Sequence, residues 1–375
     1  MLTIEKLDTN NKDHVRRFTR LPFRLYAGHP QWVPPLLIDS ETQLNREKHP
    51  FFEHSEVDFF LAVADGKDVG RIAAIENKPF NEYHDTRKAQ FYFFDSEDDQ
   101  EIAGKLFQRV FEWSHARGLD NVVGPKGISP FDGYGIQTEG FEHRQMMTMM
   151  NFNFSYYPKL VEAAGFSREV DFVSCYIDTS TFQLPERIHS IAERVQKRGT
   201  LRVLKLETKK DLRKIASQVG QAYNKAFVNN WEYYPLSERE IQFVVDTLMQ
   251  VLVPRLAKLI VHEQDIVGFV LGFPDISAAM QRIKGKLLPF GIVDILLEMR
   301  RTDWISFNGA GILPEYQGRG GNALLYSEMV KTLGNSQFKH AELTQVANTA
   351  VQMRNDLKNL NAKEYKNHRV YSRDI

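Results

Sequence analysis

The sequence predicts a mixed α/β (α+β) fold in which two halves repeat one order of elements. Each half contains a β-hairpin, since residues 58–75 and 257–273 each carry two apolar runs around a short polar turn. After each hairpin, helical periodicity alternates with short apolar strands. This alternation favours, in each half, a mixed, largely antiparallel sheet flanked by helices. The repeat is one of architecture rather than of sequence.

The elements of the first half follow its hairpin in order. Residues 89–99 have the pattern of a strand, and residues 100–118 have apolar side chains at helical spacing before Gly118, a suitable C-terminal cap. The remaining expected elements are a strand at 119–125, a short helix at 156–166 and a strand at 172–177. A connecting segment with one expected helix, residues 179–199, leads to the second half.

The second half begins with two amphipathic helices, residues 211–227 and 236–252, separated by "VNNWEYYP". The hairpin and a long insertion come next. The elements expected after the insertion are a strand at 303–313, a helix at 322–335, a strand at 340–346, a helix at 348–360 and a strand at 364–374. We therefore expect two domains, residues 1–180 and 181–375.

Composition narrows the classes of function. The length of 375 residues suggests two or three domains of ~150 residues. Lys plus Arg and Asp plus Glu both number 48, so no global positive field favours nucleic acid. Cys175 is expected to be a core residue, and no His/Cys/Asp cluster has the spacing of a metal site. There is no secretory signal and no run of about 18 apolar residues, so we expect the cytoplasm.

A glycine cluster between an expected strand and an expected helix is the strongest local signal. It is "PEYQGRGGNALL", residues 314–325. Free N–H groups at the start of a helix, together with the helix dipole, form a cradle for an anion such as phosphate. Glycines permit close approach and positive φ, and Arg319 can add a charge-assisted contact. The spacing fits neither a Walker A loop nor G-x-G-x-x-G. A glycine-rich turn without a ligand is the alternative.

The same stretch resembles the acyl-CoA-binding motif of the GNAT N-acetyltransferase superfamily, Gln/Arg-x-x-Gly-x-Gly/Ala, with Gln317, Gly320 and Asn322 at the defined positions. The resemblance implies acetyl-CoA or a longer acyl-CoA as co-substrate. It assigns the pyrophosphate to the amides of Gly318, Arg319, Gly320, Gly321 and Asn322, and the pantetheine arm to the strand end from Gly311 to Leu313. The amide of Ile312 or Leu313 would supply the contact to the thioester oxygen. On this basis Gly320→Glu is expected to abolish coenzyme A binding and to leave the fold intact.

The first half has no such loop. The corresponding stretch is "DSEDDQE", residues 95–101, whose carboxylates would repel a pyrophosphate but suit a helix N-terminus. The first half therefore resembles a degenerate GNAT copy. Other stretches, among them "HPQWVPPL", "DVGRIAAIEN" and "NNWEYYPLSEREI", resemble a bacterial family of tandem GNAT-like acyltransferases, mostly uncharacterised, that is loosely similar to the bacterial ceramide synthases, which acylate a sphingoid amine.

Acyl transfer to an amine needs a base for the amine, a donor to polarise the thioester and an acid for the leaving thiolate. In the superfamily, the acid is a Tyr in the helix that follows the cofactor-binding helix, seven residues after an Asn at the start of that helix. Asn348 matches this Asn. Position 355, where the Tyr is expected, is occupied by Asn355. Tyr365, Tyr371 and Tyr326 are the nearby substitutes, and packing is the preferred interpretation of each.

The candidate bases are Glu342, on a strand that often faces the acceptor in this fold, and Glu232, in the aromatic loop "NNWEYYP". A solvated strand-edge Glu is the alternative for Glu342, and a loop that plugs the core is the alternative for Glu232. His262 and His340 have the pattern of surface residues. No nucleophile motif is present, so direct transfer in a ternary complex is expected.

The insertion at residues 274–301 combines basic residues (Arg282, Lys284, Lys286) with an apolar run. Such a segment suits an anionic membrane surface or the roof of an acyl tunnel; a helix packed between the halves is the alternative. The sequence thus predicts an acyl-CoA-dependent N-acyltransferase that acts on a small-molecule or lipid amine, with a peripheral membrane contact through 274–301. A non-catalytic acyl-CoA sensor and an aminoacyl or peptidoglycan-type transferase are the alternatives.

Overall fold

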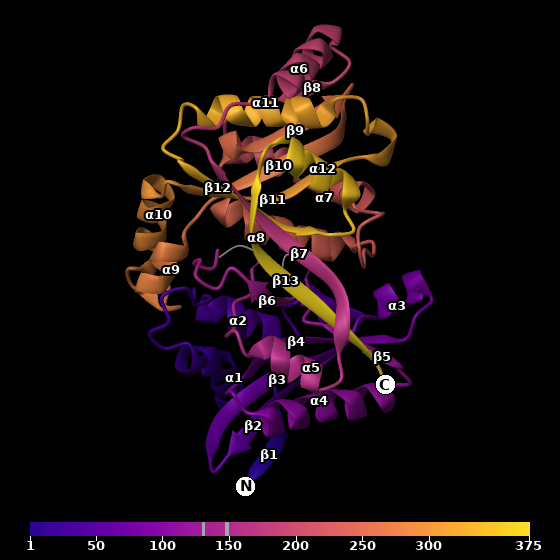
Figure 1. Ribbon diagram of the computed structural model, residues 1–375, viewed down its shortest axis with the longest axis vertical. Coiled ribbons are helices and arrows are strands. Elements are labelled where there is room, and N and C mark those ends of the chain that lie inside the picture. Colours follow the sequence, from indigo (N-terminus) through magenta and orange to yellow (C-terminus); the bar gives the residue numbers. More distant parts are fainter. Residues whose placement is uncertain (130–131, 147–149) are drawn as a thin grey trace. The chain divides into compact units, whose positions relative to one another are not determined.

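The computed structural model describes residues 1–129, 132–146 and 150–375 (Figure 1). They form two compact units. Unit 1 comprises residues 1–173, 277–296 and 365–375, and unit 2 comprises residues 174–276 and 297–364. The chain enters unit 2 within strand β7 (Ser167–Asp178) and finally leaves it within β13 (Lys363–Asp374). The division into domains 1–180 and 181–375 stays a prediction, because a compact unit does not have to be a domain that folds separately.

Unit 1 contains a sheet in the order β1-β2-β3-β4-β5-β13, to which β6 adds through β13. All pairs are antiparallel except β4 with β5. Asp65 and Gly66, both with positive φ, form the tight turn between β2 and β3, as the sequence predicts. The elements of unit 1 before β7 are β1 Leu2–Lys6, α1 Lys12–Leu25, α2 Leu37–Leu44, β2 Glu56–Ala64, β3 Lys67–Glu76, α3 Lys78–His84, β4 Lys88–Ser96, α4 Gln100–His115, β5 Asn121–Gly124, β6 Ile136–Glu139 and α5 Tyr157–Ala163.

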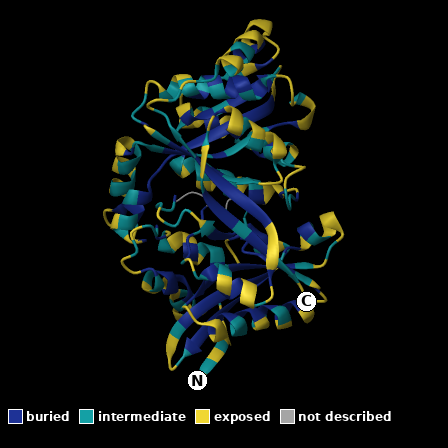
Figure 2. Ribbon diagram, in the orientation of Figure 1, coloured by how far each residue is buried: buried dark blue, intermediate teal, exposed yellow. Residues whose placement is uncertain are grey.

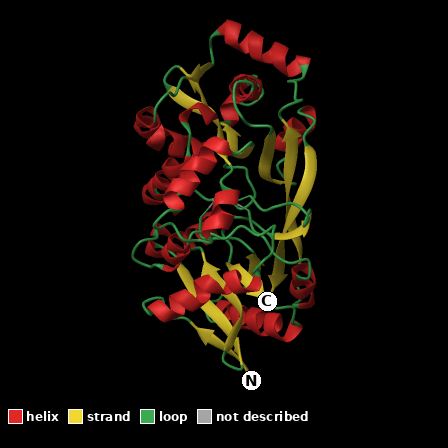
Figure 3. Cartoon of the chain, turned by 90° about the vertical axis from the view of Figure 1, so that its left-hand side faces the viewer, coloured by secondary structure: helices red, strands yellow, loops and turns green. Residues whose placement is uncertain are grey.

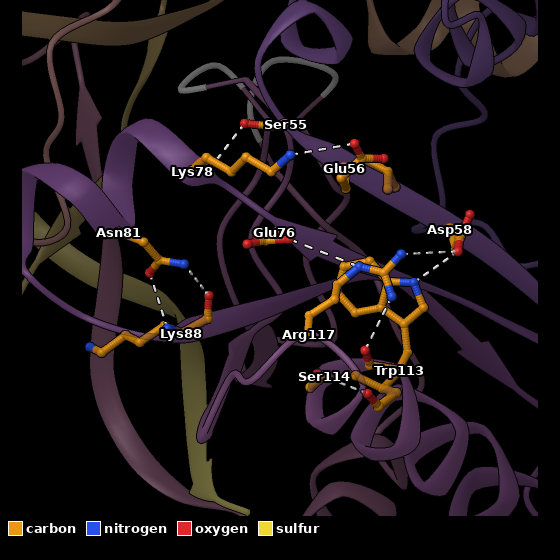
Figure 4. Close-up of polar contacts among 12 residues, drawn as sticks. Ser55, Glu56, Asp58, Glu76, Lys78, Asn81, Lys88, Trp113, Ser114 and Arg117 are labelled. Atoms are coloured by element: carbon orange, nitrogen blue, oxygen red, sulfur yellow. Dashed lines mark hydrogen bonds and ion pairs between the residues drawn. The ribbon is translucent and has the colours of Figure 1, made fainter.

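The buried carboxylate of Asp58, on β2, links the sheet of unit 1 to helix α4 (Figure 4). The indole N–H of Trp113 donates to Asp58 Oδ2 at 2.8 Å, and the Lys6 ammonium lies 2.7 Å from the same oxygen. Arg117 stacks on the Trp113 ring at 3.8 Å and reaches Glu76 at 3.9 Å. Because a buried carboxylate needs such partners, this network fixes α4 against β2 and β3.

Unit 2 contains strands in the order β7-β12-β11-β10-β9-β8. The pairs from β8 to β11 are antiparallel and β11 with β12 is parallel, so both units have one parallel pair at the corresponding place. The mixed, largely antiparallel sheet flanked by helices is thus confirmed in each unit. The elements of unit 2 after β7 and before β13 are α6 Glu186–Arg198, β8 Arg202–Leu204, α7 Lys209–Ala226, α8 Glu238–Val251, β9 Ala257–His262, β10 Asp265–Pro274, β11 Trp304–Ile312, α11 Gly321–Leu333, β12 His340–Ala347 and α12 Val351–Asn359.

Helices pack beside the strands of each unit (Figure 3), and the strands are the most buried elements (Figure 2). In unit 2, one apolar cluster joins the sheet to α7 and α8 through Phe269, Leu271 and Phe273. A second cluster joins the sheet to α11 and α6 through Ile312, Leu324 and Val195. The segment between β10 and β11 forms α9 (Ser277–Ile283) and α10 (Gly291–Arg301). Among the described residues, no helix is long and apolar enough to cross a bilayer.

Candidate functional site

The glycine loop connects β11 to α11, as the sequence predicts. The Leu313 amide donates to the Val267 carbonyl at 2.9 Å, and the Gln317 side chain donates to the Ile312 carbonyl at 3.1 Å. Gln317 therefore holds the end of the strand, and the Leu313 amide is already engaged. Gly318 and Gly320 have φ of 71° and 84°, and α11 begins at Gly321. The first N–H groups of α11 have no partner inside the helix, so an anion can bind them.

Packing within the protein explains Gly320 more directly than approach of a ligand does. A β-carbon at Gly320 would lie 2.7 Å from Val195 Cγ2 and 2.9 Å from Ile191 Cγ2, both on α6. Gly320→Glu is therefore expected to destabilise the fold as well as to affect binding, because a side chain there collides with α6 and is strained at positive φ. Gly318 differs, since a β-carbon there would meet nothing within 4 Å.

The loop forms part of a cavity of about 530 Å³ in unit 2. Helix α6 forms one wall, the start of α11 forms another and α12 contributes a third. The lining residues are Pro185, Arg187, Ile188, Ile191, Arg194, Val195, Arg198, Tyr316, Gly318, Arg319, Gly320, Gly321, Asn322, Ala323, Tyr326, Gln352, Asp356 and Asn359. The predicted residues Gly318 to Asn322 all line this cavity. Gln317, Ile312, Leu313 and Asn348 are not among its lining residues; Asn348 lies exposed in the turn before α12.

Four arginines make this cavity strongly positive. They are Arg187, Arg194 and Arg198 on α6, and Arg319 in the loop, and all four are exposed. Arg319 stacks over Tyr316 at 5.0 Å. Within the described part of the chain, none of the four forms an ion pair with a carboxylate, whereas Glu193 on the outer face of α6 pairs with His189 and Lys197. The cavity thus concentrates cationic charge beside the free N–H groups of α11.

Three of the cavity-lining residues, Asn322, Tyr326 and Asp356, are joined by hydrogen bonds that the sequence does not predict. Asp356 Oδ2 accepts from the Asn322 amide at 2.5 Å and from the Tyr326 hydroxyl at 3.0 Å. Burial raises the pKa of Asp356, while its hydrogen bonds to Asn322 and Tyr326 oppose that change. Burial also raises the pKa of Tyr326 well above its usual range. Asn322, which departs from the Gly/Ala of the motif, thus ties the first turn of α11 to α12.

Next to the loop, strand β11 pairs with β10 on one edge, while its edge toward β12 is only partly paired. Its parallel pairing with β12 runs from Trp304 and His340 to Phe307 and Leu343. Both strands continue, β11 to Ile312 and β12 to Ala347, with no further ladder pairs between them in the residues that the structure describes. A bulge precedes this stretch, since the β10 pairing shifts between Val270 and Gly272, and Gly309 has φ of 91°. An extended ligand can add to this edge as a strand would.

Glu342 is fully buried, so the solvated strand-edge interpretation is wrong. It lies on β12 opposite Ser306 in the parallel pair with β11. The Thr344 hydroxyl donates to Glu342 Oε1 at 3.3 Å and lies 2.9 Å from the Ser306 hydroxyl. Asn308 is buried beside this row on β11. A carboxylate held among hydroxyl groups in a low dielectric is suited to proton transfer.

The other candidate acid–base residues lie apart from Glu342 in sequence and element. Glu232 is half-buried, with φ of 49°, in the loop between α7 and α8, where the neighbouring Tyr233 hydroxyl donates to the Asn224 carbonyl at 2.6 Å. Tyr365 lies on β13 in unit 1, with its ring 4.8 Å from that of His143. Tyr371 donates to Glu162 at 3.1 Å within the core of unit 1. Asn355 is exposed on α12.

The stretch of unit 1 that corresponds to the glycine loop is filled by the protein's own side chains. Asp99 caps α4 by accepting from the amides of Glu101 at 2.7 Å and Ile102 at 3.4 Å. Asp95 is buried, accepts from Tyr26 at 2.7 Å and pairs with Arg71 at 2.7 Å. These contacts occupy the start of the helix with carboxylates, which supports the interpretation of a half without a cofactor loop.

Two further expectations concern metal and cysteine chemistry. Cys175 is buried, and burial raises the pKa of its thiol to about 11, so it is a core residue, as predicted. In the ranges that the structure describes, no group of three His, Cys, Asp or Glu side chains is arranged to hold a metal ion. His262 and His340 are both partly exposed: His262 contacts the Tyr316 hydroxyl at 3.3 Å, and His340 contacts Tyr176 at 2.8 Å.

Comparison with known proteins agrees with this architecture. No protein-family model matches the chain. The chain is 29% identical over 374 residues to "Bacterial ceramide synthase" of Caulobacter vibrioides (strain NA1000 / CB15N), covering 96% of this chain and 95% of that protein. It is 24% identical over 373 residues to "Protein YghO" of Escherichia coli (strain K12), covering 97% and 94%.

Among solved structures, a tandem GNAT protein from the clavulanic acid biosynthesis pathway matches with a TM-score of 0.56 at 12% identity, covering 100% of this chain and 98% of that one. A GCN5-related N-acetyltransferase from Sphaerobacter thermophilus matches with a TM-score of 0.50 at 13% identity, covering 100% and 95%. The chain therefore has the fold of the tandem GNAT acyltransferases and is similar along nearly its whole length to a bacterial ceramide synthase.

Proposed function

We propose that the protein is an acyl-CoA-dependent N-acyltransferase whose co-substrate binds to unit 2. The observation that carries the proposal is the cavity at the start of α11, where free backbone N–H groups lie beside four arginines that have no carboxylate partner among the described residues. The diphosphate of coenzyme A is an anion of the kind that such a site stabilises. The whole-chain fold similarity to tandem GNAT proteins supports the same assignment.

The pantetheine arm would lie along the unpaired edge of β11. Among the described residues no ladder pair joins β11 to β12 beyond Phe307, and this edge leads into the glycine loop, where the Ile312 carbonyl accepts from Gln317. An amide-containing arm can bond to this edge in the manner of an added strand. The diphosphate at the loop and the arm at the edge would then direct the thioester toward the bulge at Gly309.

The reaction forms one N–C bond and breaks one C–S bond. The amine gives a proton to a base, its nitrogen attacks the thioester carbonyl, and the thiolate of coenzyme A leaves and takes up a proton. We assign the base to Glu342, because it is buried on β12 beside Ser306 and Thr344. Glu232, in the loop between α7 and α8, is the second candidate for the base, and Tyr365 is the candidate for the acid.

A lipid amine is the acceptor class that the comparisons favour. The relative with 29% identity is named a ceramide synthase, and a ceramide is an N-acylated sphingoid base. A long-chain acyl-CoA and a long-chain amine would both be drawn from or delivered to a bilayer. The acceptor then requires the protein to reach a membrane surface.

Helix α10 and the segment before it carry exposed apolar and cationic side chains that suit contact with a membrane surface. Leu288 and Phe290 are 72% and 78% exposed, and Val293 and Leu296 are more than half exposed. One of the two acidic side chains of the same helix, Asp294, pairs with Arg282 at 2.7 Å, and the other is Glu298. This apolar surface is flanked by exposed cations on both sides: Lys284, Lys286, Arg300 and Arg301. An exposed apolar face with a cationic rim fits the interface of an anionic bilayer.

The test of the proposed function measures free thiol release from acetyl-CoA and palmitoyl-CoA with a panel of amines that includes sphinganine. Turnover with a long-chain amine supports the proposal. Tight binding of acyl-CoA without turnover of any amine would instead identify an acyl-CoA sensor, which the absence of a Tyr at position 355 favours. Turnover that requires aminoacyl-tRNA would identify an aminoacyl transferase and contradict the proposal.

A further inference from the structure

The two faces of helix α6 differ in whether their charged side chains are paired with opposite charges. On its outer face, Glu193 lies 3.5 Å from His189 and 4.0 Å from Lys197, so charges are compensated within the helix. On its cavity face, Arg187, Arg194 and Arg198 follow one another at helical spacing. No carboxylate pairs with these three arginines in the part of the chain that the structure describes. Arg194 and Arg198, four residues apart on the helix, repel one another, and an anion beside them would relieve the repulsion.

The position of α6 is fixed by packing, so the arginines are held at the cavity. Ile191 and Val195 lie between them on the same face and touch the position where Gly320 lacks a side chain. Val195 is buried in the cluster that contains Leu324 and Ile312. The one carboxylate among the cavity-lining residues, Asp356, is already bonded to Asn322 and Tyr326. The wall of the cavity is therefore a preorganised cationic surface.

The cationic groups exceed what a diphosphate at the loop requires. The amides at the start of α11 and the side chain of Arg319 already suffice for that group. Coenzyme A carries one more anion, the 3′-phosphate of its ribose, a monoester with a charge of roughly −1.5 to −2 at pH 7. We propose that Arg187, Arg194 and Arg198 bind this 3′-phosphate and make the site selective for coenzyme A over its 3′-dephospho form.

This inference rests on the proposed function, because it assumes that coenzyme A occupies the cavity. The glycine loop alone would bind the diphosphate of coenzyme A and of 3′-dephospho-coenzyme A equally. The inference therefore adds a selectivity between these two compounds. The arginines are exposed and lie outside the apolar contact of α6, so replacing them by glutamine keeps the helix and removes only charge and guanidinium donors.

The test compares the affinities of coenzyme A and 3′-dephospho-coenzyme A by isothermal titration calorimetry. The full-length protein is used as wild type, as the triple variant Arg187→Gln, Arg194→Gln, Arg198→Gln, and as the control Lys197→Gln. Lys197 is 81% exposed on the same helix and does not line the cavity. We expect the wild type and the control to prefer coenzyme A by about tenfold or more. We expect the triple variant to bind both compounds alike, with the affinity of the wild type for the dephospho form.

Each remaining outcome contradicts one assignment. Equal affinities of the wild type for both compounds would overturn the inference and leave the proposed function standing. Binding of neither compound would overturn both. An equal loss of affinity for both compounds in the triple variant would show that the arginines act on the diphosphate and not on the 3′-phosphate. Melting temperatures measured without ligand establish that the variants are folded, and the single variant Arg194→Gln repeats the comparison with the smallest change.

Discussion

Gly320 lies directly against Val195: a β-carbon on the glycine would be 2.7 Å from Val195 Cγ2. This contact joins the loop before α11 to helix α6, two segments separated by more than a hundred residues in sequence. It places the arginines of α6 beside the loop. It also makes the glycine a packing requirement, in addition to its positive φ of 84°.

The first prediction concerns this contact. Gly318→Ala should lower the free energy of unfolding by about 1–2 kcal/mol, the cost of a left-handed alanine, because its β-carbon enters open space. Gly320→Ala should cost roughly 1–3 kcal/mol more, since its β-carbon also collides with Val195 and Ile191. Chemical denaturation of both variants measures the difference. Equal destabilisation would show that α6 does not pack on the loop.

A second prediction tests the base. Glu342→Gln should lower kcat by roughly 10²–10⁴-fold, since glutamine keeps the size and loses the capacity to take a proton. Affinity for acyl-CoA should stay unchanged, because Glu342 does not line the cavity. Glu232→Gln is the matched comparison. If Glu232→Gln abolishes turnover and Glu342→Gln retains it, the base is Glu232. A lowered melting temperature of Glu342→Gln would mark a structural role instead.

A third prediction concerns the pH dependence of stability. His368 is fully buried in unit 1, and burial lowers its pKa from 6.5 to about 4. As pH falls from 6.5 to 4 the unfolded chain takes up a proton that the folded chain refuses, so stability is lost in this window. The lost contribution is roughly 3 kcal/mol. Asp132 acts in the opposite direction, because desolvation raises its pKa to about 6 and its stabilising contribution grows as pH falls from 6 to 3.8.

The effect of His368 is therefore measured as the difference in unfolding free energy between the wild type and a variant without this histidine. Urea unfolding of the wild type and of His368→Gln from pH 4 to pH 7.5 should show the wild type losing stability relative to the variant as the solution is acidified. A difference that stays constant across this range would contradict the buried neutral histidine.

A fourth prediction addresses the membrane. Co-sedimentation with vesicles of phosphatidylcholine and phosphatidylglycerol should be strong for the wild type and weak for the double variant Leu288→Ser, Phe290→Ser. Val351→Ser is the control, since Val351 is 66% exposed on α12, outside the proposed surface. Binding should fall with salt, because Lys284 and Lys286 contribute through electrostatic attraction. Equal binding by all three proteins would exclude this surface.

Much of the fold follows from local signals in the sequence. The Asp65-Gly66 turn and the alternation around it predict the first hairpin. The polar residues 263–265 predict the turn of the second hairpin, which the structure places at Glu263 and Gln264, with Asp265 already paired in β10. The strand–loop–helix setting of the glycine loop can be predicted, because glycines indicate positive φ and the pattern after them indicates the start of a helix. The helix expected from Asn348 begins at Val351, a shift typical of element ends.

The site could be predicted only in part, since its other members depend on contacts between distant segments. A helix was expected between residues 179 and 199, but periodicity does not tell which surface it covers, and so the role of Arg194 was not visible. Glu342 lies in a strand whose neighbours on both sides decide its burial, and the sequence favoured a solvated position. Asn322 departed from the motif because it bonds to Asp356, a partner in a different helix.

The central claim, that the loop before α11 binds the diphosphate of acyl-CoA, is tested most directly at Gly318. This residue lines the cavity, has positive φ and has open space around its β-carbon, so aspartate and asparagine both fit there and differ only in charge. Calorimetry with acetyl-CoA should show Gly318→Asn binding nearly as the wild type does and Gly318→Asp binding at least about tenfold more weakly, since a carboxylate then faces the phosphates. Equal affinities of the two variants would contradict the claim.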